Sequence, residues 1–147
     1  MADKPPFRDL TSFEHELTLH LLDAPVRGRR DQVDALRDAL AKQVPNSRAR
    51  TLDEGPDCFL IEWELPSGWP QGHYPVVEGE AEDADGVPIW VLLFEASGRL
   101  WGLDLVKGDG SPIVRMPEVA QFRAWVSGDL DSAIPPWPIG KRPVDRH

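Results

Sequence analysis

The chain has 147 residues and a formal net charge of -9, and 41% of its residues are hydrophobic. This size is typical of one domain, predicted to span residues 1–147, with a flexible leader at 1–9 and a flexible tail at 140–147. The single Cys58 excludes an intrachain disulfide, and no apolar run reaches the roughly 18 residues of a membrane span, so we expect a cytoplasmic protein. The negative charge disfavours binding to nucleic acid and to anionic membranes.

Two helices are predicted near the N-terminus. The first spans residues 11–23, because Thr11 and Glu14 have the spacing of a capping box, whose side chains bind the free amides at a helix start. The second spans residues 31–44. Its apolar side chains return at helical intervals: Val33, Leu36, Leu40 and Val44. Each helix therefore has an apolar face to bury.

A half-buried strand is predicted over residues 58–65, where apolar and polar side chains alternate. We expect it to be the first strand of a sheet and to pair antiparallel with residues 76–82. The loop between them, residues 66–75, contains Trp69 and Tyr74 among three prolines and two glycines. Such a loop suits either a packed lid or a recognition loop.

Residues 75–106 are predicted to form three antiparallel strands joined by two tight turns. Asp85-Gly86 and Ser97-Gly98 lie between runs of strand formers, and glycine in second place is typical of two-residue hairpin turns. The register that these turns imply pairs Phe94 with Trp101, Leu92 with Leu103, Trp90 with Leu105, Ala81 with Trp90, Gly79 with Leu92 and Val77 with Phe94. It places the tryptophans on the buried face and a row of glutamates on the other.

A third helix is predicted over residues 117–126, with Pro117 at its first position and Gly128 after its end. Residues 129–147 are proline-rich and predicted to be extended, with Trp137 against the body. The fold class is thus α+β: two N-terminal helices, a four-stranded antiparallel meander sheet, one C-terminal helix and an extended tail. The helices are expected on the face that carries the tryptophans of the sheet: Trp63, Trp90 and Trp101.

The acidic residues are concentrated in the predicted sheet. Residues 53–106 contain twelve acidic side chains and one basic side chain, Arg99. We expect the outer sheet face, with an aromatic rim, to bind a partner through these residues: Glu62, Glu64, Glu78, Glu80, Glu82, Asp104, Trp69 and Tyr74. Such a surface attracts a basic protein by electrostatic steering.

The sequence carries no signature of common catalytic chemistry. It has no serine elbow, no phosphate-binding glycine loop, no dinucleotide fingerprint and no His-Glu metal helix, so no catalytic residue, metal ligand or cofactor is assigned. The glutamate row leaves a carboxylate-based hydrolase as an alternative. A homo-oligomeric subunit, such as a homodimer that associates through the half-apolar sheet face, is the other.

A set of turn residues carries a family resemblance. These are Leu10-Thr11-Ser12-Phe13-Glu14, Gly79-Glu80, Asp83-Ala84-Asp85-Gly86-Val87-Pro88-Ile89, Gly98-Arg99-Leu100, Leu103-Asp104, Lys107, Asp109 and Ser111-Pro112. Over about two thirds of the chain, the pattern resembles a family of small uncharacterised bacterial proteins. Some small acidic proteins of this kind are similar to immunity proteins, which neutralise a toxin by covering its basic cleft. The resemblance implies a non-enzymatic binding protein and assigns no site residue.

Overall fold

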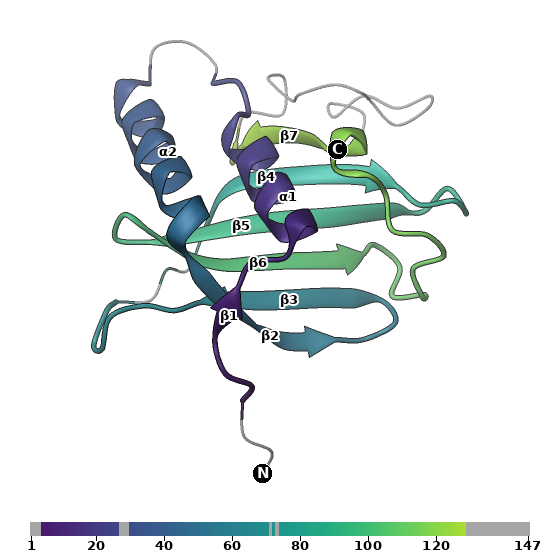
Figure 1. The fold of residues 1–147 in the computed structure, drawn as a ribbon. Helices are drawn as coiled ribbons and strands as arrows, with labels where there is room; N and C mark the ends of the chain where they lie inside the picture. Colours follow the sequence, from purple (N-terminus) through teal and green to yellow (C-terminus); the bar gives the residue numbers. More distant parts are fainter. Residues whose placement is uncertain (1–3, 27–29, 71, 73, 129–147) are drawn as a thin grey trace.

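In the part of the chain that the structure describes, seven antiparallel strands form one sheet, and two helices lie on one of its faces (Figure 1). The structure is a computed structural model that describes residues 4–26, 30–70, 72 and 74–128. Within these residues the strands are β1 (Arg8–Asp9), β2 (Arg48–Glu54), β3 (Cys58–Trp63), β4 (Pro75–Glu82), β5 (Pro88–Ala96), β6 (Arg99–Lys107) and β7 (Arg123–Val126). The helices are α1 (Ser12–Leu22) and α2 (Asp31–Gln43), with two short 3₁₀ turns, η1 (Val44–Asn46) and η2 (Val119–Gln121). The strand order across the sheet is β1-β2-β3-β6-β5-β4-β7.

Both predicted N-terminal helices are confirmed. Thr11 caps α1 as expected: its side chain accepts from the Glu14 amide at 3.1 Å, and its own amide donates to the Glu14 carboxylate at 2.9 Å. Glu14 is buried and also pairs with Arg8 at 2.6 Å, which ties β1 to the start of α1. Residues 8–9 of the expected leader are therefore paired in the sheet.

The predicted four-stranded meander with a third helix is wrong. β3 pairs with β2 and β6 instead of β4, and β7 takes the outer edge of β4. In the segment predicted as the third helix, Glu118 and Gln121 do form a capping box, but only the single turn η2 follows. After Phe122, four residues, all buried, form β7 because the outer edge of β4 offers unpaired backbone groups. The expected tail, with Trp137, lies outside the described residues.

The two turns of the central segment are in place, but the predicted register is wrong by one residue. The first turn has five residues, 83–87, so that Glu82 rather than Asp83 pairs with Pro88. The second turn is tight, with Ser97 and Gly98 at φ 48° and 88°, but a bulge follows at Trp101 and pairs Phe94 with Gly102. A shift of one residue moves every side chain of a strand to the opposite face.

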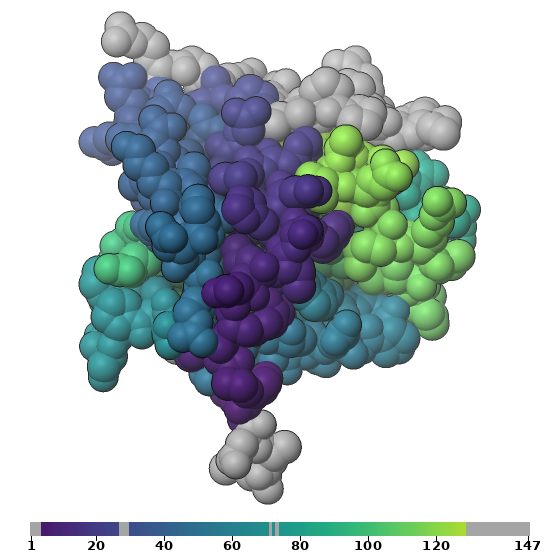
Figure 2. Space-filling view, in the orientation of Figure 1, coloured from purple at the N-terminus to yellow at the C-terminus, as the bar shows by residue number. Residues whose placement is uncertain are grey.

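The hydrophobic core lies between the sheet and the two helices. Figure 2 shows this side of the molecule, where α1, α2 and the segment around η2 cover the sheet. The core is built from the helices and from alternate positions of the strands: Leu17, Leu21, Leu40, Ile61, Trp63, Val91, Leu93, Leu103, Leu105 and Phe122. Trp63 thus lies in the core as predicted, whereas Trp90 and Trp101 do not.

Candidate functional site

Within the described residues, one face of the sheet carries no helix, and Gly79 identifies which side chains point to it. A Cβ on Gly79 would lie 3.0 Å from Leu21 Cδ2 of α1, so Gly79 faces the helices. Side chains alternate along a strand, and directly paired residues point the same way, so Glu78 and Glu80 point to the other side. We call this surface the helix-free face; it comprises Leu60, Glu62, Glu78, Glu80, Trp90, Leu92, Phe94, Trp101, Asp104, Val106, Arg123 and Trp125.

The centre of the helix-free face is apolar and aromatic. The rings of Phe94 and Trp101 meet edge to face, with centroids 5.6 Å apart and planes at 86°. Leu60 and Leu92 are each only partly buried, on the strands that flank β6. The expected separation of tryptophans from carboxylates is therefore wrong, because Trp90 and Trp101 share this face with the glutamates.

Asp104 lies in the middle of this apolar area. It pairs with Leu60 on one side and Leu92 on the other. Burial raises the pKa of its carboxyl group above the ordinary value for aspartate. A partly buried carboxylate between two leucines is suited to receiving a cation or a proton.

Replacing Asp104 with asparagine should raise the thermal unfolding midpoint at pH 7 by roughly 2 °C. Because the pKa of Asp104 is higher in the folded state, its contribution to stability is fully present below about pH 4, the ordinary value for aspartate. That contribution is lost as the pH rises through the folded pKa. Melting curves from pH 3 to 8 should therefore converge at low pH, and a constant difference would refute the explanation. Asp38→Asn, at an exposed position of α2, is the control.

Two of the predicted glutamates are already paired within the chain. Glu62 accepts from Arg50 Nε at 2.6 Å and lies 3.6 Å from Lys4 Nζ. Glu80 is 3% exposed and forms an ion pair with Arg123, while the indole N–H of Trp90 donates to its other oxygen at 3.1 Å. Neither carboxylate therefore offers a full negative charge to a partner.

The other predicted partner-binding residues are dispersed. Glu64 is exposed just after β3 and lines a cavity of about 350 Å³ with Lys42 and Arg48. Glu82 lines a cavity of about 290 Å³ with Arg115 and Gln121. Glu64 and Glu82 therefore lie outside the centre of the helix-free face.

The two aromatic residues predicted at the rim differ in their surroundings. Trp69 donates its indole N–H to the Ala96 carbonyl oxygen at 2.6 Å, and the Arg99 guanidinium lies 5.0 Å from its ring centroid. These contacts fit a packed lid. Tyr74 is 84% exposed, immediately before β4. Of the eight predicted residues, the structure brings together only Glu62, Glu78, Glu80 and Asp104.

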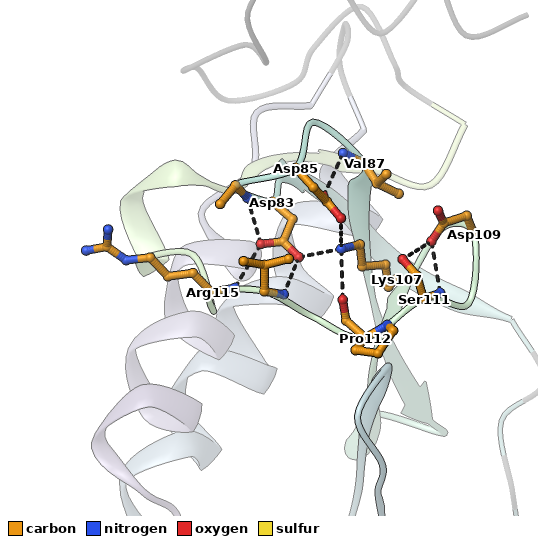
Figure 3. Close-up of polar contacts among 10 residues, drawn as sticks. Asp83, Asp85, Val87, Lys107, Asp109, Ser111, Pro112 and Arg115 are labelled. Carbon is orange, nitrogen blue, oxygen red and sulfur yellow. Dashed lines mark hydrogen bonds and ion pairs between the residues drawn. The ribbon is translucent and has the colours of Figure 1, made fainter.

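A buried ionic network joins the turn after β4 to the end of β6 (Figure 3). Lys107 Nζ lies 2.7 Å from Asp83 Oδ2, 2.5 Å from Asp85 Oδ2 and 3.0 Å from the Pro112 carbonyl oxygen. The Asp83 carboxylate also accepts hydrogen bonds from the amides of Ala84, Val114 and Arg115 at 2.7 to 2.9 Å. The amides of Val114 and Arg115 thus fix the segment after β6 to the β4–β5 turn, and Lys107 joins the end of β6 to the same turn.

The electrostatics of this network indicate a structural role. Burial acts to raise the pKa of Asp83, but hydrogen bonds from Lys107 and the three amides outweigh it and hold the pKa well below its usual range. Burial likewise acts to lower the pKa of Lys107, but its bonds to Asp83 and Asp85 outweigh it and raise the pKa. Both groups are held in their charged forms, which suits neither a general base nor a nucleophilic amine.

Sequence reasoning missed the aromatic and aliphatic half of the site. Trp90, Leu92, Phe94 and Trp101 were assigned to the core because the hairpins were taken as regular. Gly102 is the signal that could have corrected this, since a glycine inside a strand often marks a bulge. Its position opposite Phe94 leaves room for that ring, 3.8 Å from where a Cβ would lie.

No three His, Cys, Asp or Glu side chains among the described residues are grouped so as to bind a metal ion. None of the helices described is long and apolar enough to cross a membrane.

Comparison with known proteins gives one match. No curated protein and no solved structure matches the chain. The predicted resemblance to a family without an assigned function is confirmed over a shorter stretch than expected, which contains β4, β5, β6 and the network of Lys107. Residues 70–117 match a family described as a domain of unknown function (DUF6984).

Proposed function

We propose that this protein is a non-enzymatic binding protein that holds a protein partner on its helix-free face. The observation that carries the proposal is the group of Leu92, Phe94 and Trp101, which are only partly buried at the centre of the seven-stranded sheet. Central strands normally have both faces covered or one polar face in water. A large apolar area with aromatic side chains on an open face is typical of protein interfaces.

The partner's expected chemistry follows from the carboxylates within this area. Glu78 and Asp104 lie beside the apolar group, so a partner with apolar side chains and at least one Lys or Arg would fit best. An immunity protein that covers a basic toxin domain is one instance of this function. In this proposal, apolar packing on Phe94 and Trp101 would supply most of the binding affinity, and the acidic side chains would orient the partner.

A photo-crosslinking amino acid at Leu92 tests the proposal in the native cell. The same group at Ala39, exposed on α2, is the matched control. A protein captured from position 92 alone would then be purified and its affinity measured. We expect this protein to be net basic. Phe94→Ala should weaken its binding at least tenfold, since replacing a hot-spot residue by alanine costs about 2 kcal/mol or more of binding free energy. Capture from both positions, or unchanged affinity of Phe94→Ala, would contradict the proposal.

A homodimer is the second candidate, and the same partly buried aromatic group favours it. Two copies of the helix-free face would bring Glu78 and Asp104 of each copy close together, which is unfavourable unless the carboxyl groups are protonated. Sedimentation velocity at micromolar concentration distinguishes the candidates, because a monomer with Phe94 accessible leaves the face free for another protein. A dimer that Phe94→Ala dissociates would replace the proposed heteromeric function.

A further inference from the structure

Glu82, the last residue of β4, has a buried carboxylate oxygen that accepts no hydrogen bond. The pairing of β4 with β5 ends here, with Glu82 opposite Pro88. The Oε2 atom of Glu82 is buried, and no donor among the described residues reaches it. A buried carboxylate oxygen without a donor costs free energy, because folding has removed the water that solvated it. Such an atom therefore points to a ligand that supplies an N–H or O–H group.

Glu82 lines a cavity of about 290 Å³ at the end of β4. A water molecule occupies about 30 Å³ of liquid, so the cavity has room for a compound of about ten non-hydrogen atoms. Four of its lining side chains are polar or charged: Glu82, Arg115, Glu118 and Gln121. The size and the lining together suit a small polar metabolite.

Arg115 brings a positive charge to the same cavity. Its amide donates to Asp83 Oδ1 at 2.9 Å, and the Val114 amide donates to Asp83 Oδ2 at 2.7 Å. Asp83 directly follows Glu82, so the buried network holds Arg115 and Glu82 in fixed positions relative to each other. The Arg115 side chain extends away from this network (Figure 3), and among the described residues no carboxylate pairs with its guanidinium.

The two other polar side chains of the cavity are partly engaged with each other. Gln121 Oε1 accepts from the Glu118 amide at 2.8 Å, and the Glu118 side chain accepts from the Gln121 amide. The Glu118 carboxylate is thus bound locally. What the cavity offers a ligand is one acceptor, Glu82 Oε2, and two sets of donors, the Arg115 guanidinium and the Gln121 side-chain amide.

We propose that this cavity binds a free amino acid with an apolar side chain. The ammonium group donates to Glu82 Oε2, and the carboxylate accepts from the Arg115 guanidinium, since charge-assisted hydrogen bonds of both kinds are strong. A simple anion would leave Glu82 without a donor, and a simple cation would leave Arg115 without an acceptor. Met116, which is 39% exposed, and Pro117 supply apolar contacts for the ligand side chain.

This site assigns a role to the buried network beyond stability. Lys107 and the amides of Val114 and Arg115 fix Asp83, and Asp83 in turn sets the distance between the two ligand-binding charges. The site uses none of the apolar side chains at the centre of the helix-free face, so it can hold or fail independently of the proposed binding function.

Titration of the full chain, followed by NMR, tests the site with L-leucine, L-methionine and L-valine as probes. We expect at least one of them to saturate below about 1 mM and to shift the amide signals of Ala84 and Gln121, but not those of α2. The N-acetyl derivative of that amino acid lacks the ammonium group, and its amide derivative lacks the carboxylate, so each should bind at least tenfold more weakly. No saturable binding of any probe, or equal binding of the derivatives, would overturn the proposal.

Substitutions of the two charged residues identify the site. Glu82→Gln and Arg115→Gln should each weaken binding of the amino acid at least tenfold, whereas Glu16→Gln, exposed on α1, should not. Thermal melting gives a second readout, because a bound ligand raises the melting temperature of wild type and should no longer do so for Glu82→Gln. Unchanged affinity of either cavity variant would overturn the proposal, and so would the same loss in Glu16→Gln.

Discussion

Replacing Lys107 with methionine is expected to lower the melting temperature by roughly 10 °C, the largest loss among the substitutions considered. The side chains of Lys107 and Asp83 are both 0% exposed, and methionine keeps the length of the lysine but removes its charge. The Asp83 carboxylate would then be buried without a cation. Differential scanning calorimetry at pH 7 measures the effect.

Asp85→Asn is the matched control for this substitution. Asp85 contacts the same Nζ atom, but its side chain is 36% exposed and can be solvated, so we expect a change of only a few degrees. The low pKa of Asp83 also fixes a pH dependence: its stabilisation is present above about pH 4 and is lost as the pH falls toward the folded value. Equal melting temperatures for Lys107→Met and wild type would show that the network does not stabilise the fold.

Gly79→Ala is expected to destabilise the protein by about 2 kcal/mol, through overpacking between the sheet and α1. A Cβ at this position would lie 2.8 Å from Val91 Cγ1, 3.0 Å from Leu21 Cδ2 and 3.1 Å from the Arg123 carbonyl oxygen. These neighbours belong to β5, α1 and β7, so the methyl group has no direction in which to move. Urea denaturation gives the free energy of unfolding directly.

Gly102→Ala provides the same chemical change where space exists. Its nearest atoms would lie 3.6 to 3.9 Å away, an ordinary contact distance. We expect a change within about 0.5 kcal/mol, because the restricted unfolded chain offsets any small strain. If Gly102→Ala were as costly as Gly79→Ala, the loss would reflect β-sheet glycines in general rather than close packing on α1.

Local signals predicted the elements better than they predicted their arrangement. The capping box of Thr11 and the turn at Ser97 each depend on a few neighbouring residues, and both are present. The place of β3 beside β6 depends on contacts between residues 40 to 48 positions apart, and no local pattern encodes them. β2 carries charged residues because it lies near the edge of the sheet, where four of its seven residues are exposed: Arg48, Leu52, Asp53 and Glu54.

The candidate site was only partly predictable for the same reason. Alternation correctly groups Glu78 with Glu80, and it groups Trp90 with Leu92 and Phe94. What it cannot give is that both groups share one face, since the five-residue turn 83–87 pairs Glu80 rather than Ala81 with Trp90. The neutralisation of Glu80 by Arg123 was equally hidden, because their pairing requires β7, whose four residues fit a helix as well as a strand.

The placement of β7 has a consequence for synthesis of the chain. β4 is made well before the strand that completes its outer edge, since their paired residues Glu80 and Arg123 are 43 positions apart. Until β7 joins, a nascent molecule exposes a row of free amides and carbonyls on β4 that another nascent molecule can extend. Premature termination before residue 123 would make that vulnerability permanent, so truncated products should aggregate rather than remain as soluble fragments.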